Sequence, residues 1–204
     1  GQSSVANPRD MVLIVGFDGV APAYIVSKRP FVGYWEYLLD EAIYTAPATV
    51  NWQGAALLSR EGKLLGIGSL AVGDAIGQGG VPGNMFVPID TLKPVLGDFI
   101  ANGRATTKPR PWLGITSQEV QGKVIVTRVT AEGPAEEAGL KAGDIILGLS
   151  GEPLKGQADF YTRLWKTGEA GVEVTLDVLK GNKVEAVKVK SIARERHFRE
   201  RPVY

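Results

Sequence analysis

Short apolar runs closed by glycine or by a tight turn constrain the fold of this chain more than any other feature of its sequence. The runs MVLIVG (Met11–Gly16), EAIYTA (Glu41–Ala46) and LLGI (Leu64–Ile67) are of strand length and lie near turn-forming residues. Glycine occurs 26 times among the 204 residues, and much of it lies between such runs. The pattern predicts a mostly β protein, built from many short strands joined by tight turns.

Composition and charge argue against several classes of partner and cofactor. The net charge of +1 shows no basic footprint for nucleic acid, and no apolar run approaches the roughly 20 residues of a membrane span. Cysteine is absent, and no histidine or carboxylate cluster has metal-ligand spacing. We therefore expect no metal and no other cofactor. The start at Gly1, without a methionine, suggests a processed or cut terminus.

One amphipathic helix is predicted ahead of a polar stretch in the middle of the chain. Asp90 is the expected N-cap and Gly103 the expected stop. The apolar face between them comprises Leu92, Val95, Leu96, Phe99 and Ile100. The polar stretch, residues 104–110, has the composition of a linker. We therefore divide the chain into a first module (1–103), a linker (104–110), a second module (111–193) and a charged tail (194–204).

The second module has its own order of strands and short helices. Strands are expected at KVIVTRV (123–129) and DIILGL (144–149), and in a hairpin of VEVTLDVL (172–179) with residues 184–189. Helices are expected at GPAEEAGL (133–140) and ADFYTRLW (158–165). This order, after PWLGI (111–115), resembles a bacterial, protease-associated PDZ domain over nearly all of residues 111–193. The resemblance implies a small β-barrel or sandwich capped by two helices.

The PDZ resemblance implies a groove that captures an extended peptide by its C-terminal carboxylate. The carboxylate-binding loop and the strand that would pair with the peptide match one run of residues: Trp112, Leu113, Gly114, Ile115 and Thr116. Successive N–H groups in such a loop form an anion-binding nest, and Gly114 allows close backbone approach. Ile115, Phe160 and Leu164 are the expected pocket for the last side chain. Alternatively, these three residues are ordinary core, which a small domain needs in any case.

The first module resembles the second barrel of trypsin-like serine proteases of the HtrA (Deg) type. The resemblance depends on the order of LLGIGSL (64–70), a glycine-rich loop, MFVPID (85–90), the amphipathic helix, the linker and the PDZ domain. It implies a partial trypsin-like β-barrel, with serine endopeptidase activity as the activity of the family. The nucleophile loop of the family falls on NWQGAALL (51–58). The segment RPFVGYWEYLLDEAIYTAP (29–47) is richer in aromatic residues than the family pattern.

The sequence departs from this pattern at the positions that would carry catalysis. The loop reads Asn51, Trp52, Gln53, Gly54, which places Gln53 where the family has its serine nucleophile. A glutamine amide cannot form an acyl-enzyme. The catalytic histidine and aspartate of the family lie in a first barrel, which we expect to be absent because only about ten residues precede the first strand. The single histidine, His197, lies in the tail and is expected to be solvated, so we expect no catalytic residue.

Three functions remain open. The leading hypothesis is a binding protein, in which the PDZ groove captures C-terminal or unfolded protein segments and the barrel is a pseudoprotease. The alternative is a C-terminal fragment of an HtrA-type serine endopeptidase, a hydrolase of protein quality control, and a third possibility is a structural scaffold without peptide affinity. The resemblance implies a periplasmic or otherwise extracytoplasmic location. A lone second barrel would expose apolar surface, so we expect self-association, or shielding of that surface by Phe31–Tyr37.

Overall fold

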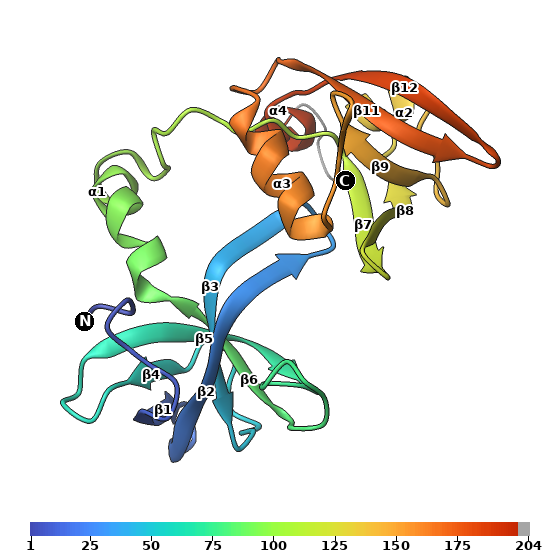
Figure 1. Ribbon diagram of the computed structural model, residues 1–204. Helices are drawn as coiled ribbons and strands as arrows, with labels where there is room; N and C mark the ends of the chain where they lie inside the picture. Colours follow the sequence, from blue (N-terminus) through green and yellow to red (C-terminus); the bar gives the residue numbers. More distant parts are fainter. Residues whose placement is uncertain (200–204) are drawn as a thin grey trace. The chain divides into compact units, whose positions relative to one another are not determined.

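A computed structural model describes residues 1–199 of the chain, which fall into two compact units (Figure 1). The first unit consists of residues 1–31 and 39–107. Among the described residues, the second consists of residues 108–199 and also contains Val32–Leu38, which come from the middle of the first module in sequence. The predicted first module, residues 1–103, is one continuous segment, whereas the structure groups Val32–Leu38 with the second unit.

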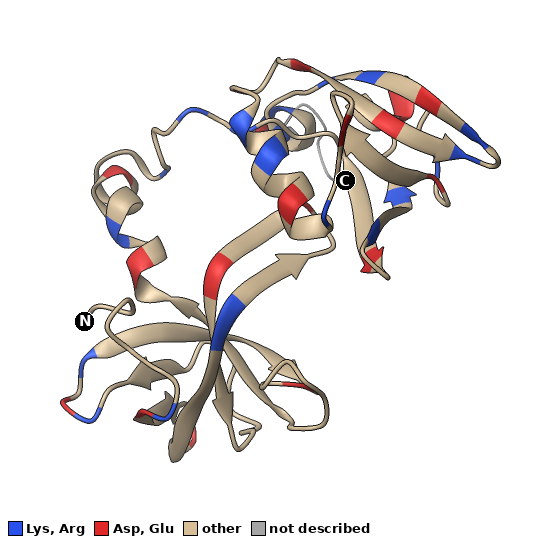
Figure 2. Ribbon diagram, viewed as in Figure 1, with Lys and Arg blue, Asp and Glu red and all other residues tan. Residues whose placement is uncertain are grey.

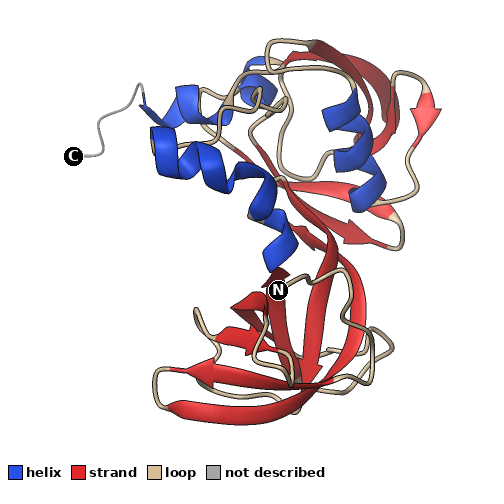
Figure 3. Ribbon diagram, turned by 90° about the vertical axis from the view of Figure 1, so that its left-hand side faces the viewer, coloured by secondary structure: helices blue, strands red, loops and turns tan. Residues whose placement is uncertain are grey.

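The first unit is a closed barrel with the strand order β1-β2-β3-β6-β5-β4. Its strands are β1 (Met11–Gly16), β2 (Gly19–Gly33), β3 (Tyr37–Ala46), β4 (Ala56–Leu58), β5 (Leu64–Val72) and β6 (Gly83–Pro88). Alternating side chains of β1, such as Val12 and Ile14, point into a core that also holds Leu57 and Phe86. Strands dominate both units, as Figure 3 shows in red, and the prediction of a mostly β protein is confirmed.

The predicted amphipathic helix exists, but its start and its apolar face differ from expectation. A 3-10 turn, η1 (Ile89–Thr91), precedes α1 (Lys93–Asn102), and Gly103 ends α1 with φ 66° and an N–H bond to Phe99 O. The Asp90 N-cap prediction is wrong, because the Asp90 carboxylate accepts the Ser4 N–H at 2.8 Å and pairs with Lys93. None of the residues in α1 is buried.

The second unit contains a sheet in the order β12-β11-β9-β8-β7, with β10 paired to β9. Its strands are β7 (Ile115–Val120), β8 (Lys123–Val129), β9 (Ile145–Leu149), β10 (Glu152–Pro153), β11 (Glu173–Lys180) and β12 (Lys183–Lys190). Its helices are α2 (Pro134–Glu137), α3 (Gln157–Lys166) and α4 (Arg194–Arg199). Basic and acidic positions are interspersed along β12 and α3 (Figure 2).

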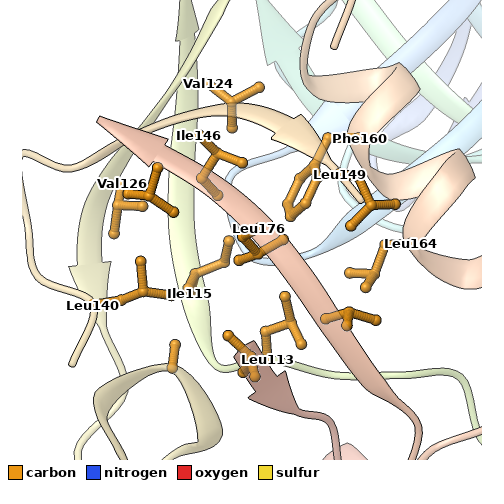
Figure 4. Packing of buried hydrophobic residues seen from close by; sticks show 14 of the residues in the cluster. Leu113, Ile115, Val124, Val126, Leu140, Ile146, Leu149, Phe160, Leu164 and Leu176 are labelled. Carbon is orange, nitrogen blue, oxygen red and sulfur yellow. The ribbon is translucent and has the colours of Figure 1, made fainter. Parts of the chain in front are cut away.

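One apolar cluster forms the core of the second unit (Figure 4). The alternation predicted for residues 172–179 is present, because Val174, Leu176 and Val178 of β11 are all buried in this cluster. Phe160 and Leu164 enter it from α3, one helical turn apart. α3 therefore packs on the core beside Ile115, where the predicted peptide pocket lies.

The charged tail forms a helix as far as the structure describes it. His197 of α4 is only 8% exposed, and its ring centroid lies 5.1 Å from that of Trp112. The prediction of a solvated His197 is therefore wrong, because α4 packs on the Trp112 ring. Residues 200–204 of the predicted tail lie outside the described residues. None of the helices in the described range has the length and apolar character to cross a membrane.

Candidate functional site

The predicted carboxylate-binding loop holds a carboxylate, and it comes from the chain itself. The N–H groups of Gly114 and Ile115 donate to Glu36 Oε1 at 2.8 and 3.0 Å. The Leu113 N–H lies 3.3 Å from Oε1 and 3.2 Å from Oε2 of the same side chain. Three successive backbone donors thus converge on one anion, which is the geometry of a nest.

The loop takes this shape because Gly114 adopts φ 80°, a left-handed conformation that side-chain-bearing residues rarely take. A Cβ at Gly114 would lie 3.1 Å from the Trp112 ring and 3.4 Å from Thr130 Cβ. Carbonyl groups on the other side of the loop are also fixed. Gly114 O accepts the Thr130 N–H at 2.7 Å, and Leu113 O accepts the Ala135 N–H at 2.9 Å. The donors are therefore held in place by Thr130, just after β8, and by Ala135 in α2.

Two opposing effects set the protonation of Glu36. Burial of its carboxyl group is the larger effect, and it raises the pKa of Glu36 from 4.5 to about 7. The three N–H donors of the loop and the positive charge of Arg194 oppose this increase, because they stabilise the ionised form. Glu36 is therefore a carboxyl group that changes charge near neutral pH while it occupies the loop.

The backbone beside Glu36 pairs with the edge strand of the sheet. Tyr34 O accepts the Ser117 N–H of β7 at 2.9 Å. This is the position where the PDZ resemblance expects an extended ligand strand, one that adds to the sheet by main-chain bonds. Val32 and Leu38, which flank this stretch, pack against the core cluster of the second unit.

Three buried polar side chains, those of Ser117, Gln157 and Tyr161, are hydrogen-bonded to one another at β7. Ser117 Oγ lies 2.8 Å from the Tyr161 hydroxyl, and Gln157 Nε2 donates to Ser117 O and Oγ at 2.9 and 3.0 Å. The Tyr161 hydroxyl also interacts with the backbone of Glu36, and burial is the main cause that raises the pKa of Tyr161. These three side chains tie β7 to α3.

The three residues predicted to form the ligand pocket lie together, and all are fully packed. Ile115 is 3% exposed, and Phe160 and Leu164 are 0% exposed. All three belong to the core cluster, against which Val32 and Leu38 also pack. The pocket and core interpretations are therefore not exclusive: these residues are core while Val32–Leu38 are in place.

Trp112 has a different role from its neighbours in the predicted loop. Its N–H donates to Ile192 O at 3.0 Å and its carbonyl accepts the Ile192 N–H at 3.1 Å. The Trp112 N–H is therefore engaged and does not point to the carboxylate, so Trp112 supports the loop from the side. Thr116 O accepts a bond from the Thr127 hydroxyl at 3.1 Å, which ties β7 to β8.

The nucleophile-loop frame lies in the first unit, between β3 and β4. Gln53 is exposed and Gly54 adopts φ 68°. The turn is fixed by the Ala55 N–H, which donates to Trp52 O at 3.1 Å, and by a close approach of Gly68, where a Cβ would lie 1.8 Å from Trp52 O. Asn51 lines a polar depression of about 110 Å³. Within the described part of the chain, no group of three His, Asp or Glu side chains is placed to hold a metal ion.

The sequence pattern did not predict that Val32–Leu38 belong to the second unit. Glu36, Tyr34, Val32 and Leu38 were assigned to the first module, and their contacts with the second unit span about eighty positions of sequence. One signal was available, namely the aromatic-rich stretch 29–47, which departs from the family pattern. Within this stretch, the segment is distinguished by Glu36, a carboxylate that lies between Trp35 and Tyr37.

Comparisons with known proteins support the family resemblance. A family model described as PDZ domain matches residues 111–191. The serine protease Do-like HtrB of Bacillus subtilis is 30% identical over 218 residues, which cover 92% of this chain and 46% of that protein. A probable periplasmic serine endoprotease DegP-like of Pseudomonas fluorescens is 29% identical over 190 residues, which cover 85% of this chain and 38% of that protein.

Solved structures show the same fold. The HtrA-type protease AlgW with decapeptide aligns with a TM-score of 0.61 and 22% identity, over 95% of this chain and 63% of that one. The resemblance to HtrA-type proteases with a PDZ domain, and the expected fold class, are thereby confirmed. The chain spans less than half the length of the two curated relatives named above.

Proposed function

Because the chain is a relative of the HtrA-type serine proteases and carries their PDZ domain at residues 111–191, we propose that it binds peptides. The ligand is an extended protein segment with a free C-terminus and an apolar last residue. Its carboxylate binds the N–H groups of Leu113, Gly114 and Ile115, and its backbone pairs with β7. The last side chain packs on Ile115, Phe160 and Leu164.

This proposal rests on one observation, the position of the Glu36 carboxylate at the N–H groups of Leu113, Gly114 and Ile115. Three successive N–H groups within 3.3 Å of one carboxylate constitute a built anion receptor. Hydrogen bonds to charged acceptors are stronger than neutral ones, contributing about 1.5–3 kcal/mol each when formed in a protein. A C-terminal carboxylate has the same chemistry as the glutamate side chain, so the same loop supports its capture.

For the barrel we propose a pseudoprotease role. Gln53 supplies an amide where an acyl-enzyme requires a hydroxyl, and no side chain of the loop can replace it. The alternative is that the chain is part of a serine endopeptidase, as its relatives are named, and the search of a longer parent sequence for the missing histidine and aspartate would decide between the two. Two such relatives are named as periplasmic, which supports an extracytoplasmic location.

The experiment is a titration of the full chain with a pool of dye-labelled decapeptides that end in free valine or leucine. One buried side chain of this size contributes roughly 1.5–3 kcal/mol, so we expect modest affinity. The matched control is the same pool with an amidated C-terminus, which lacks the anion and should bind at least tenfold more weakly. Backbone NMR shifts should cluster at residues 113–117 and in α3. Equal binding of both pools, or shifts elsewhere, would refute the groove assignment.

A further inference from the structure

The segment Val32–Leu38, here called the hairpin tip, occupies each part of the groove that a peptide would need. We infer that the hairpin tip is a built-in ligand of the PDZ groove, and that a free C-terminus binds by displacing it. This inference rests on the proposed function, because it takes the groove to be a peptide site. It adds that the site is autoinhibited within a single chain.

The carboxylate position is filled first. Glu36 Oε1 accepts from Gly114 and Ile115 at 2.8 and 3.0 Å, and the Leu113 N–H is shared between both oxygens. A peptide carboxylate would need these same three donors. Two carboxylates at one nest repel each other and cannot both be satisfied, so the occupants are mutually exclusive.

The strand position is filled by the backbone of the hairpin tip. Tyr34 O takes the Ser117 N–H at 2.9 Å. Tyr34 lies two residues before Glu36, and Ser117 lies two residues after Ile115, so the strand bond and the carboxylate bonds belong to one continuous register. A peptide strand added to β7 would require the Ser117 donor and would lose it to the hairpin tip.

The geometry at Glu36 explains how an internal segment can imitate a chain end. A C-terminal peptide stops at its carboxylate, whereas the hairpin must continue into β3. Glu36 has φ 57°, a left-handed conformation that is unfavourable for a residue with a Cβ. The backbone turns away at this residue while the side chain reaches the nest. Strain of this kind persists when surrounding contacts over-determine it.

The apolar position is filled by Val32 and Leu38. Both pack against the cluster that contains Ile115, Phe160 and Leu164. With these three at 3% exposure or less, the last side chain of a peptide has no open surface to enter until the hairpin tip leaves. Carboxylate, strand and pocket therefore have one occupant.

An internal ligand is a strong competitor because it is tethered. Tethered ligands act at effective concentrations of roughly millimolar or more. If the hairpin tip fills the groove in nine of ten molecules, the apparent affinity for a peptide falls about tenfold. Weakening the hairpin tip should therefore strengthen peptide binding, which is the opposite of what loss of an ordinary binding residue would do.

The test compares peptide affinity in the full chain and in Glu36→Ala, with the free-carboxylate decapeptide pool as the probe. Glu36→Ala removes the resident carboxylate and should increase affinity several-fold, up to about tenfold if the hairpin tip fills the groove in nine of ten wild-type molecules. The matched control is Glu185→Ala, which removes an exposed carboxylate from β12 and should leave affinity unchanged. A second variant, Leu38→Ala, weakens the apolar contact and should shift affinity in the same direction as Glu36→Ala, by a smaller factor.

The outcomes separate the inference from the proposed function. If Glu36→Ala binds the peptides more tightly than wild type and Glu185→Ala does not, the result supports both the peptide site and the built-in ligand. Equal affinity of wild type and Glu36→Ala overturns the built-in ligand and leaves the peptide site standing. Absence of binding in every variant overturns the proposed function, and displacement with it. The NMR shifts of the Leu113–Ile115 amides should differ between wild type and Glu36→Ala, because these amides donate to the Glu36 carboxylate. Unchanged shifts would show that the carboxylate does not bind this loop.

Discussion

The protonation of Glu36 should make the stability of the second unit depend on pH in a direction unusual for a carboxylate. The perturbation is Glu36→Gln, which keeps the size of the side chain and fixes it in an uncharged state. Burial raises the pKa of Glu36 from 4.5 to about 7 when the hairpin tip is in place. A raised carboxyl pKa contributes stability that is fully present below the unfolded value and is lost as the pH rises through the folded value.

The magnitude follows from these two pKa values. Between pH 5 and pH 8 the linkage relation gives a loss of about 2.5 kcal/mol in the unfolding free energy of wild type relative to Glu36→Gln. For a domain of about 100 residues this corresponds to a relative decrease in Tm of roughly 10 °C. Detachment of the hairpin tip at high pH would cap the loss at the free energy of docking, so this value is an upper limit.

The assay is thermal unfolding of both proteins at several pH values, followed by tryptophan fluorescence. Trp35, Trp112 and Trp165 belong to the second unit and only Trp52 to the first, so the signal reports mainly on the unit of interest.

Three charged or polar groups near Glu36 bear on the sign of the result. The positive charge of Arg194 and the loop N–H groups favour the ionised carboxylate and lower the pKa of Glu36, whereas burial, the larger effect, raises it. The Tyr161 hydroxyl remains protonated over this pH range and adds no titration of its own. A pH-independent difference would show that the carboxyl is not buried in the loop. A wild type that gains stability with pH would show that the N–H donors outweigh burial.

Three further predictions concern the two loops and the buried polar group. A serine-directed phosphonate probe should label neither wild type nor Gln53→Ser, because a serine without a base is a weak nucleophile; labelling would contradict the pseudoprotease proposal. Gly114→Val should weaken peptide binding at least tenfold, because a Cβ there would lie 3.1 Å from the Trp112 ring. The control is Gly122→Val, which has a similar φ but no neighbour within 4 Å, and it should keep its peptide affinity in the same titration. Tyr161→Phe should lower the unfolding free energy in urea by about 1–2 kcal/mol, as two buried partners lose a hydrogen bond, and an unchanged midpoint would count against that network.

The parts of the fold that sequence predicted are those encoded locally. The alternation in residues 172–179 gave β11, and the spacing of Phe160 and Leu164 placed both on the core side of α3. Gly114 was expected to allow close backbone approach in the loop, and its N–H does lie 2.8 Å from a carboxylate oxygen; its left-handed φ of 80° was not predicted. In each case a period or a special residue within a few positions carries the information.

The contacts that sequence could not predict join residues far apart along the chain. Glu36 and Gly114 are 78 positions apart, and neither has a local pattern that names the other. The solvated role expected for His197 failed for the same reason, since its partner Trp112 is a distant residue on another element. In α1 the apolar periodicity indicated a face, but periodicity does not reveal what covers that face, and Ile100 is 79% exposed.

The seven residues of the hairpin tip also determine what proteolytic cleavage between the two units would do. Residues 32–38 belong to the second unit while residues 1–31 and 39–107 belong to the first, so the polypeptide passes from one unit to the other at three places. A single nick within residues 104–110 would sever only one of these passages. The two fragments would then stay associated through Glu36, Tyr34 and the apolar contacts of Val32 and Leu38, until something competed for the groove. A peptide that enters the groove would be, for the nicked molecule, a dissociation signal.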